Sequence, residues 1–112
     1  MFANHTREGY AEPVDGIRMK TLVHGEKSLL TRFELTQGAI LPAHSHPQEQ
    51  TGYLVSGRII LYIGEDSFEA GPGDSWCIGR DVEHRAEILE DSVAIEVFAP
   101  VREDYLPETA RG

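Results

Sequence analysis

Alternation of hydrophobic and polar residues is the main pattern along the chain. It predicts a series of short strands, because successive side chains of a strand point to opposite faces of a sheet. Glycine and proline residues separate these stretches, as in the "GPGD" turn of residues 71–74. The strands expected from this pattern span residues 17–23, 29–35, 50–55, 58–63, 67–70, 75–78, 84–89 and 93–98.

Helical periodicity is not sustained over any ten-residue window of the sequence. The tail, residues 100–112, can hold one helical turn at most, and we expect its end to be frayed. Many short strands at close spacing are typical of an antiparallel sandwich or barrel. The expected fold is therefore all-β, with one domain over residues 1–112.

Charge and composition narrow the classes of partner. The chain of 112 residues carries 19 acidic and 10 basic residues, a formal net charge of −9. This balance argues against nucleic acid, and it means that an anionic small molecule would need a local positive centre. The single cysteine, Cys77, cannot form an intrachain disulfide. Together with the absence of a signal-like start or a membrane-length apolar run, it predicts a cytoplasmic protein without a membrane partner.

Histidines supply the clearest chemistry in the sequence. His44 and His46 have the i, i+2 spacing that places two side chains on one face of a strand. His84 begins a later expected strand and could complete a set of three imidazoles. Such a set suits one divalent metal ion, of which Zn, Ni, Mn and Fe are the candidates. The alternative is that the His-x-His pair is part of a solvated loop.

Two longer stretches carry a family resemblance. The first resembles the leading motif of the cupins, with glutamine in place of the usual glutamate (Gly38, His44, His46, Gln50 and Gly57). The second, "GDSWCIGRDVEH" over residues 73–84, resembles their second motif and places His84 at the third histidine ligand. It departs from the motif at Gly79, Asp81 and Ile88. The resemblance covers about residues 29–98 and implies a double-stranded β-helix (jelly-roll) barrel, preceded by strand 17–23, with one metal ion in its mouth.

Position 50 has a rival ligand next to it. Glu49 is the acid nearest the histidines, but adjacent strand residues face opposite sides, so only one of the two can point at them. The register of the cupin motif implies Gln50; the alternative is that Gln50 is a polar wall residue. A neutral amide would leave the full charge on a divalent metal and favour Lewis-acid chemistry over iron-dependent oxygenation.

The last expected strand has two rows of side chains. Val93, Ile95 and Val97 form an apolar row, and Ala94, Glu96 and Phe98 form the other. If the valine row packs inside, Glu96 is an ordinary outward charge; if the other row does, Glu96 and Phe98 share the interior.

A closer resemblance bears on this choice. An HSHPxEQ-type stretch, a third histidine and acid-x-aromatic-x3-Arg near the end are similar to the KdgF family of cupins from pectin and alginate degradation. Those proteins convert 4,5-unsaturated monouronates into linear keto-uronates. The resemblance implies a metal site of three histidines and a glutamine, catalytic roles for Glu96 and Arg102, and substrate contacts from Phe98 and Arg102. The metal ligands would be His44, His46, Gln50 and His84. Glu96 departs from the aspartate of that family.

Other functions and assemblies stay open. A small Fe(II)-type dioxygenase and a non-enzymatic module that binds a metal or a small ligand are the alternatives to a uronate isomerase. Tyr53 and Trp76 could line a cavity, although ordinary packing is the simpler expectation, and Cys77 is expected to be a small buried hydrophobe. We also expect a homodimer, with strand 17–23 as a possible exchanged edge.

Overall fold

The computed structural model describes residues 1–106 and confirms the all-β prediction. Its strands are β1 (Ala11–Val14), β2 (Ile17–His24), β3 (Leu29–Leu35), β4 (Ile40–His44), β5 (Glu49–Ile63), β6 (Asp66–Ala70), β7 (Ser75–Ile78) and β8 (His84–Ala99). A single 3-10 turn, η1 (Glu103–Tyr105), follows β8 and agrees with the one helical turn expected in the tail. The expected frayed end lies outside the described residues.

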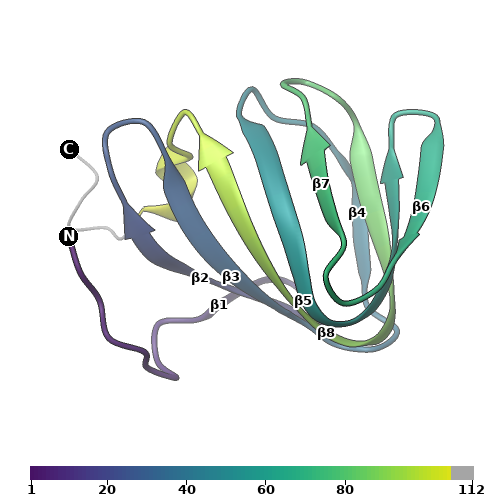
Figure 1. Ribbon diagram of the computed structural model, residues 1–112, viewed down its shortest axis with the longest axis horizontal. Helices are drawn as coiled ribbons and strands as arrows, with labels where there is room; N and C mark the ends of the chain where they lie inside the picture. The colour runs from purple at the N-terminus through teal and green to yellow at the C-terminus, as the bar shows by residue number, and fades with distance from the viewer. Residues whose placement is uncertain (107–112) are drawn as a thin grey trace.

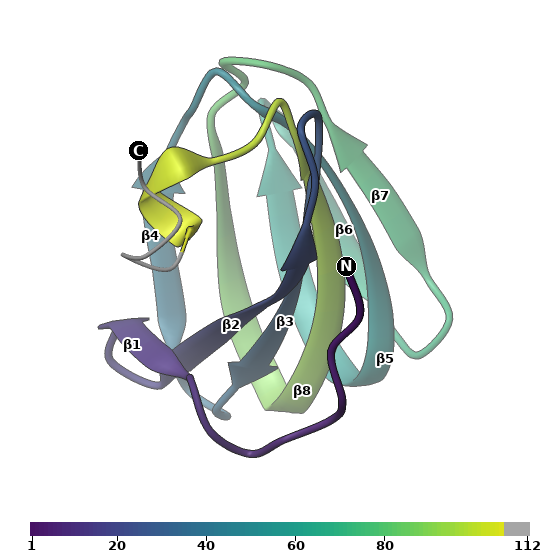
Figure 2. The ribbon, with the colours of Figure 1, turned by 90° about the vertical axis from the view of Figure 1, so that its left-hand side faces the viewer.

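Two long strands organise the barrel. β5 and β8 pair with each other along most of their length, and each bends so that its two halves belong to different sheets (Figures 1 and 2). One sheet has the order β1-β2-β3-β8-β5-β7, with the second half of β8 and the first half of β5. The other has the order β4-β8-β5-β6, with the opposite halves. All of these pairings are antiparallel, as a jelly-roll barrel requires.

The continuity of β5 and β8 corrects the strand prediction. Residues 50–55 and 58–63 were expected as two strands, as were 84–89 and 93–98, but each pair is one strand. Gly57 bends β5 with a positive φ of 95°, and a side chain there would overlap the backbone of Asp91 and Ser92. Glycine therefore marks the close approach of two paired, bent strands here, and not a hairpin.

Two short strands escaped the pattern. β1 and β4 each contain a proline, Pro13 and Pro42, which weakens a strand prediction because proline cannot donate to a ladder. Their pairing with β2 and β8 is visible only in the folded chain. By contrast, residues 29–35 and 75–78 were predicted with the bounds that β3 and β7 have.

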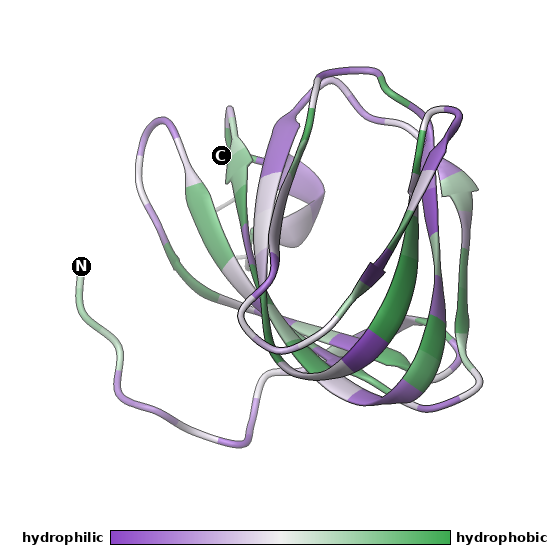
Figure 3. Cartoon of the chain, turned by 45° about the vertical axis from the view of Figure 1, so that its right-hand side comes forward, coloured by the Kyte–Doolittle hydropathy of each residue, from purple (hydrophilic) through white to green (hydrophobic). Residues whose placement is uncertain are grey.

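The core fills the interior of the barrel. Hydrophobic and hydrophilic positions alternate along the long strands in Figure 3, and the hydrophobic side chains turn inward. Leu54, which is fully buried, Ile59 and Ile88 belong to this core. Among the described residues, no helix is long and apolar enough to span a membrane.

The strand expected to be an exchanged edge is paired within the chain. β2 pairs with β3 along its length, and β1 covers its other side from Ile17 to Met19. The part of β2 beyond Met19 has no β1 partner, so a contact between copies could use only that stretch or another surface.

Candidate metal centre and barrel cavity

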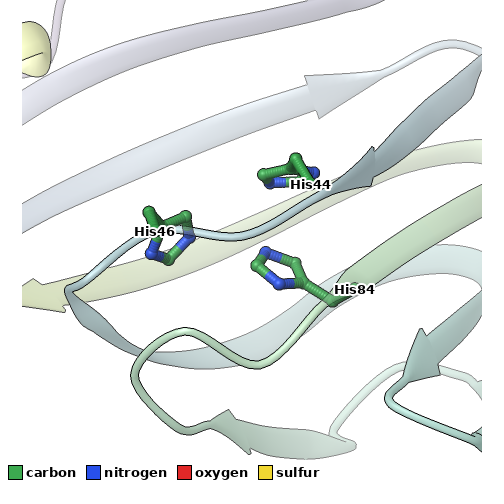
Figure 4. Close-up of side chains that lie close together, drawn as sticks. All are labelled: His44, His46 and His84. Atoms are coloured by element: carbon green, nitrogen blue, oxygen red, sulfur yellow. The ribbon is translucent and has the colours of Figure 1, made fainter.

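Three histidines converge at one end of the barrel. His44 ends β4, His46 lies in the following loop, and His84 begins β8, directly across from His44 in the ladder (Figure 4). Their potential ligand nitrogens all lie within 4.8 Å of one another. The backbone N–H of Asp81 donates to the carbonyl of His46 at 2.8 Å and ties the two histidine-bearing loops together. Asp81 itself has a φ of 61°, which an aspartate tolerates at a position where glycine is usual in the second cupin motif.

Each imidazole is held in the same way. The Nδ1 atoms of His44, His46 and His84 lie 2.8–2.9 Å from the backbone carbonyls of residues 42, 48 and 82, respectively. A carbonyl can only accept a hydrogen bond, so Nδ1 carries the proton and Nε2 presents a lone pair. This fixed tautomer is the usual one for histidine ligands of a metal.

The electrostatics favour neutral rings at His46 and His84. Burial lowers the pKa of His84 to about 4, and the neighbouring histidines and Arg102 act in the same direction. Burial and Arg102 also lower the pKa of His46. Among the described residues, His84 Nε2 is the buried side-chain atom without a hydrogen-bond partner. A buried acceptor left unpaired is costly, and a metal ion in the cluster would satisfy it.

Gln50 completes this set from the second position of β5. It is 5% exposed, and its Oε1 lies 3.0 Å from Nε2 of His46. Its Nε2 donates to Oε1 of Glu96 at 2.5 Å, which orients the amide oxygen toward the histidines. Since the proton of His46 is on Nδ1, both His46 Nε2 and Gln50 Oε1 can only accept hydrogen bonds, so two acceptors face each other. Two ligands at about 2.1 Å from one metal ion and at right angles would be about 3.0 Å apart, so the three histidines and Gln50 fit a divalent ion.

Glu49 faces the other way. Glu49 is exposed, and the sulfur of Cys77 lies 3.8 Å from Oε1 of its carboxylate. The strand parity that separated Glu49 from Gln50 in the sequence is therefore observed. Cys77 is exposed, so the expectation of a buried hydrophobe at this position was wrong.

Glu96 lies inside the barrel, on the row with Ala94 and Phe98, all three buried. Its Oε1 also accepts a hydrogen bond from the indole N–H of Trp76 at 3.0 Å. Burial raises the pKa of Glu96, while these hydrogen bonds and the charge of Arg102 oppose the shift. The open choice between the two rows of this strand is thus decided: the Val93 row faces outward.

Arg102 lies just beyond β8, at the start of η1. Its guanidinium stacks over the rings of Tyr105 and Phe98, with 3.9 and 5.2 Å to the centroids. Two of its nitrogens pair with the two oxygens of Asp104, at 2.7 and 3.2 Å, and a third donates to the hydroxyl of Tyr105 at 3.0 Å. Arg102 is mostly covered, with 14% of its side chain exposed, whereas Asp104 is 59% exposed.

These groups share one cavity. Its wall includes members of each set singled out in the sequence: the histidines, Gln50, the acid-aromatic pair and the arginine. The residues concerned are His44, Gln50, His84, Glu96, Phe98 and Arg102. His46 does not line this cavity, but its ring packs against that of Phe98, which does, with 5.6 Å between the ring centroids. The roles of these residues as ligands and catalysts remain predictions; their proximity is observed.

Sequence reasoning missed Tyr105 as a contributor to the wall and gave Trp76 only as a possible one. Trp76, for which ordinary packing was the simpler expectation, bonds Glu96, and Tyr105 bonds Arg102. Burial raises the pKa of Tyr105, which keeps its hydroxyl protonated. The only sequence signal for Trp76 was its position opposite a glycine, Gly52, which becomes readable only when the strand pairing is known.

A barrel of two sheets with a histidine cluster in its mouth is the architecture of the cupins. The chain matches the cupin domain family over residues 31–99 and therefore belongs to it. It is similar to the pectin degradation protein KdgF of Dickeya dadantii, with 28% identity over 94 residues that cover 82% of this chain and 86% of that protein.

Solved structures agree with this assignment. KdgF from Halomonas sp. superposes with a TM-score of 0.88 at 27% identity, over 95% of this chain and 100% of that one. An RmlC-like cupin from Shewanella frigidimarina NCIMB 400 also reaches 0.88, at 22% identity and over 94% and 95% of the two chains. The latter likeness concerns the fold alone.

Proposed function

We propose that this cupin is a metal-dependent enzyme that acts on small sugar acids, and that it linearises 4,5-unsaturated uronates. The observation that carries the proposal is the single cavity that joins a metal-fitting set, a buried carboxylate and a covered arginine. The similarity to two KdgF proteins, one of them described as a pectin degradation protein, supports the substrate class.

The ligands of the metal would be His44, His46, His84 and Gln50. A bound divalent ion would act as a Lewis acid and polarise a hydroxyl or carbonyl oxygen of the substrate. The chain's own residues supply the rest. Ring opening followed by enol-to-keto conversion moves protons without adding atoms, so one positioned proton carrier suffices. Glu96 lies beside the metal-fitting set, through Gln50, and is suited to that role.

Arg102 would receive the substrate carboxylate. A guanidinium fork binds a planar carboxylate through two parallel hydrogen bonds, and Asp104 occupies this fork in the structure. We therefore propose that the substrate carboxylate replaces that of Asp104. Phe98 would form the wall against the sugar ring, since it is buried between His46 and Arg102.

A direct assay tests the proposal. Purified protein would be analysed for its metal content and mixed with unsaturated monouronates made by a polysaccharide lyase. Turnover should remove the ultraviolet absorbance of the double bond conjugated to the carboxylate, and removal of the metal by a chelator should stop it. Oxygen uptake with bound Fe(II) would instead support a dioxygenase. Ligand binding without any turnover would support the non-enzymatic alternative.

We also propose that the protein is a homodimer. The outer face of the larger sheet exposes Tyr53 and Val55, 49% and 48% accessible, beside the outward row of Val93 and Ile95. A contiguous apolar surface of this kind is typical of contacts between subunits. Light scattering should give twice the mass of the 12.5 kDa chain, and Tyr53→Asp should shift it toward that of the monomer. A wild-type mass of one chain at micromolar concentration would rule out the dimer.

A further inference from the structure

Trp76 reaches Glu96 across an intervening strand. Gly52 of β5 pairs with Trp76 of β7 on one side and with Glu96 of β8 on the other. Neighbouring strands lie about 4.8 Å apart, so two strand spacings separate the backbones of Trp76 and Glu96. The indole nevertheless places its N–H 3.0 Å from Oε1 of Glu96. It can do so because the indole lies over the glycine, which has no side chain in its way.

Gly52 is required for this geometry. A Cβ at Gly52 would overlap three atoms of the indole, one of them the nitrogen that bonds Glu96. The φ of Gly52 is not in the left-handed region, so its backbone conformation does not call for glycine. Close approach of the tryptophan ring is the reason for glycine at this position.

Both donors to Glu96 use the same oxygen. Gln50 Nε2 and Trp76 Nε1 each bond Oε1, at 2.5 and 3.0 Å, while no residue of the described chain bonds Oε2. A glutamate side chain has several rotatable bonds, and one hydrogen bond would leave it free to turn about that contact. Two donors from two different strands, β5 and β7, restrict the plane of the carboxylate as well as its place.

We propose that Trp76 is a positioning residue of this site: with Gln50 it holds Oε1 of Glu96, so that Oε2 is the oxygen presented to the substrate. This inference rests on the proposed function, because it assigns the proton-carrying atom of the same carboxylate. It also gives Gly52 a role, since the indole can reach Glu96 only over a residue that has no side chain.

The kinetic test removes the N–H donor and keeps an aromatic ring, although a smaller one. Trp76→Phe should lower kcat by about tenfold and change KM by less than about threefold, because the carboxylate loses orientation while the Arg102 fork is untouched. Its metal content should equal that of the wild type. Tyr62→Phe, which removes a hydroxyl group from an aromatic residue outside the cavity, serves as the control and should leave kcat unchanged. An unchanged kcat in Trp76→Phe would overturn the inference.

Gly52→Ala is a second variant that keeps the indole and displaces it. It should lower kcat about as much as Trp76→Phe, and the double variant should lose no more than either single one, because all three lack the same hydrogen bond. Multiplying effects would show that the two residues act separately. If Trp76→Phe does not fold, Gly52→Ala and the spectroscopic test below decide the inference.

A spectroscopic test needs no substrate. Trp76 is the single tryptophan of the chain, so its indole N–H gives one assignable nuclear magnetic resonance signal. Glu96→Ala should move this signal upfield and speed its exchange with water, and Zn²⁺ added to metal-free wild type should shift it through Gln50 and Glu96. If Glu96→Ala left the position and the exchange rate of this signal unchanged, the positioning role would be overturned. Wild-type protein without turnover of uronates would refute the proposed function, and the inference would then stand or fall on this signal alone.

Discussion

The two ends of the barrel interior belong to the same strands, but one end is lined by apolar side chains and the other by polar ones. Where β5 and β8 bend, the interior is closed by aliphatic side chains such as Leu54, Ile59 and Ile88. At the other end, the same strands and β4 supply His44, Gln50, His84 and Glu96. The apolar end needs nothing beyond close packing to be stable. The polar end leaves an unpaired nitrogen and two facing acceptors, which a bound cation would satisfy.

Removing a ligand should have the largest effect. His84→Ala should abolish activity and weaken metal binding by about 100-fold or more, because a three-histidine set loses its most buried member. His24→Ala, at the end of β2 and outside the cluster, is the control. Elemental analysis after dialysis would measure the retained metal, and circular dichroism would verify the fold. Full metal retention in His84→Ala would mean that the polar end is not a metal site.

The apolar end should respond in stability alone. Leu54 is fully buried, so Leu54→Ala should lower the free energy of unfolding by about 2–5 kcal/mol. Ile40, at the start of β4, is 60% exposed, and Ile40→Ala should cost about 0.5 kcal/mol or less. Urea unfolding gives both values. Metal affinity should be the same in both variants; if Leu54→Ala lost its metal, the two ends would not be separable.

The pH dependence of the free energy of unfolding, measured on the metal-free protein, also distinguishes the polar end from the apolar end. The pKa of His84 is lowered to about 4 in the folded state from 6.5, so the unfolded chain binds more protons between these values. The free energy of unfolding should therefore fall as the pH drops from about 6.5 to about 4. The His84 imidazole contributes at most about 1.4 kcal/mol of this loss per pH unit. Wild type should lose more stability over this range than His84→Asn, in which the titrating ring is gone. Parallel urea-unfolding curves against pH would contradict this cause.

Gln50→Glu tests why this position is an amide. The variant should still bind a divalent ion, because carboxylate is a common ligand, but kcat should fall by about tenfold. The Gln50 N–H that bonds Glu96 would be replaced by an oxygen, and two carboxylates at that distance repel unless they share a proton. Glu49→Gln, the reverse change on the outer face, should leave kcat unaltered. Equal turnover by Gln50→Glu and wild type would show that the amide has no such role.

The smallest expected effect concerns the Arg102 fork. Asp104→Asn should lower KM for a uronate by about threefold, because the substrate carboxylate would no longer compete with a charged partner. Glu103→Gln makes the same change of charge one residue away and should have a smaller effect. A higher KM in Asp104→Asn would mean that Asp104 orients Arg102 and does not occupy the substrate's place.

Much of this molecule was predictable from the pattern of residues. Alternation located β3 and β7 with their observed bounds, and the spacing of His44 and His46 singled out a pair of ligands, because both rest on local geometry. His84 joined this pair only through the resemblance of residues 73–84 to the second cupin motif. The pattern failed where the reason for a residue is not local. Gly57 is typical of a turn in the sequence, yet it is glycine because the backbone of the paired strand β8 approaches closely there.

What the sequence by itself determined is the strand character of the chain and the set of side chains that could bind a metal. The tertiary structure decided which face of residues 93–98 turns inward, since Glu96 and Ile95 alternate equally well on either side of an isolated strand. It also decided that Gln50 and Trp76 meet on one oxygen of Glu96. Those three residues come from three strands, and only the pairing of β5 with both β7 and β8 brings them within hydrogen-bond distance.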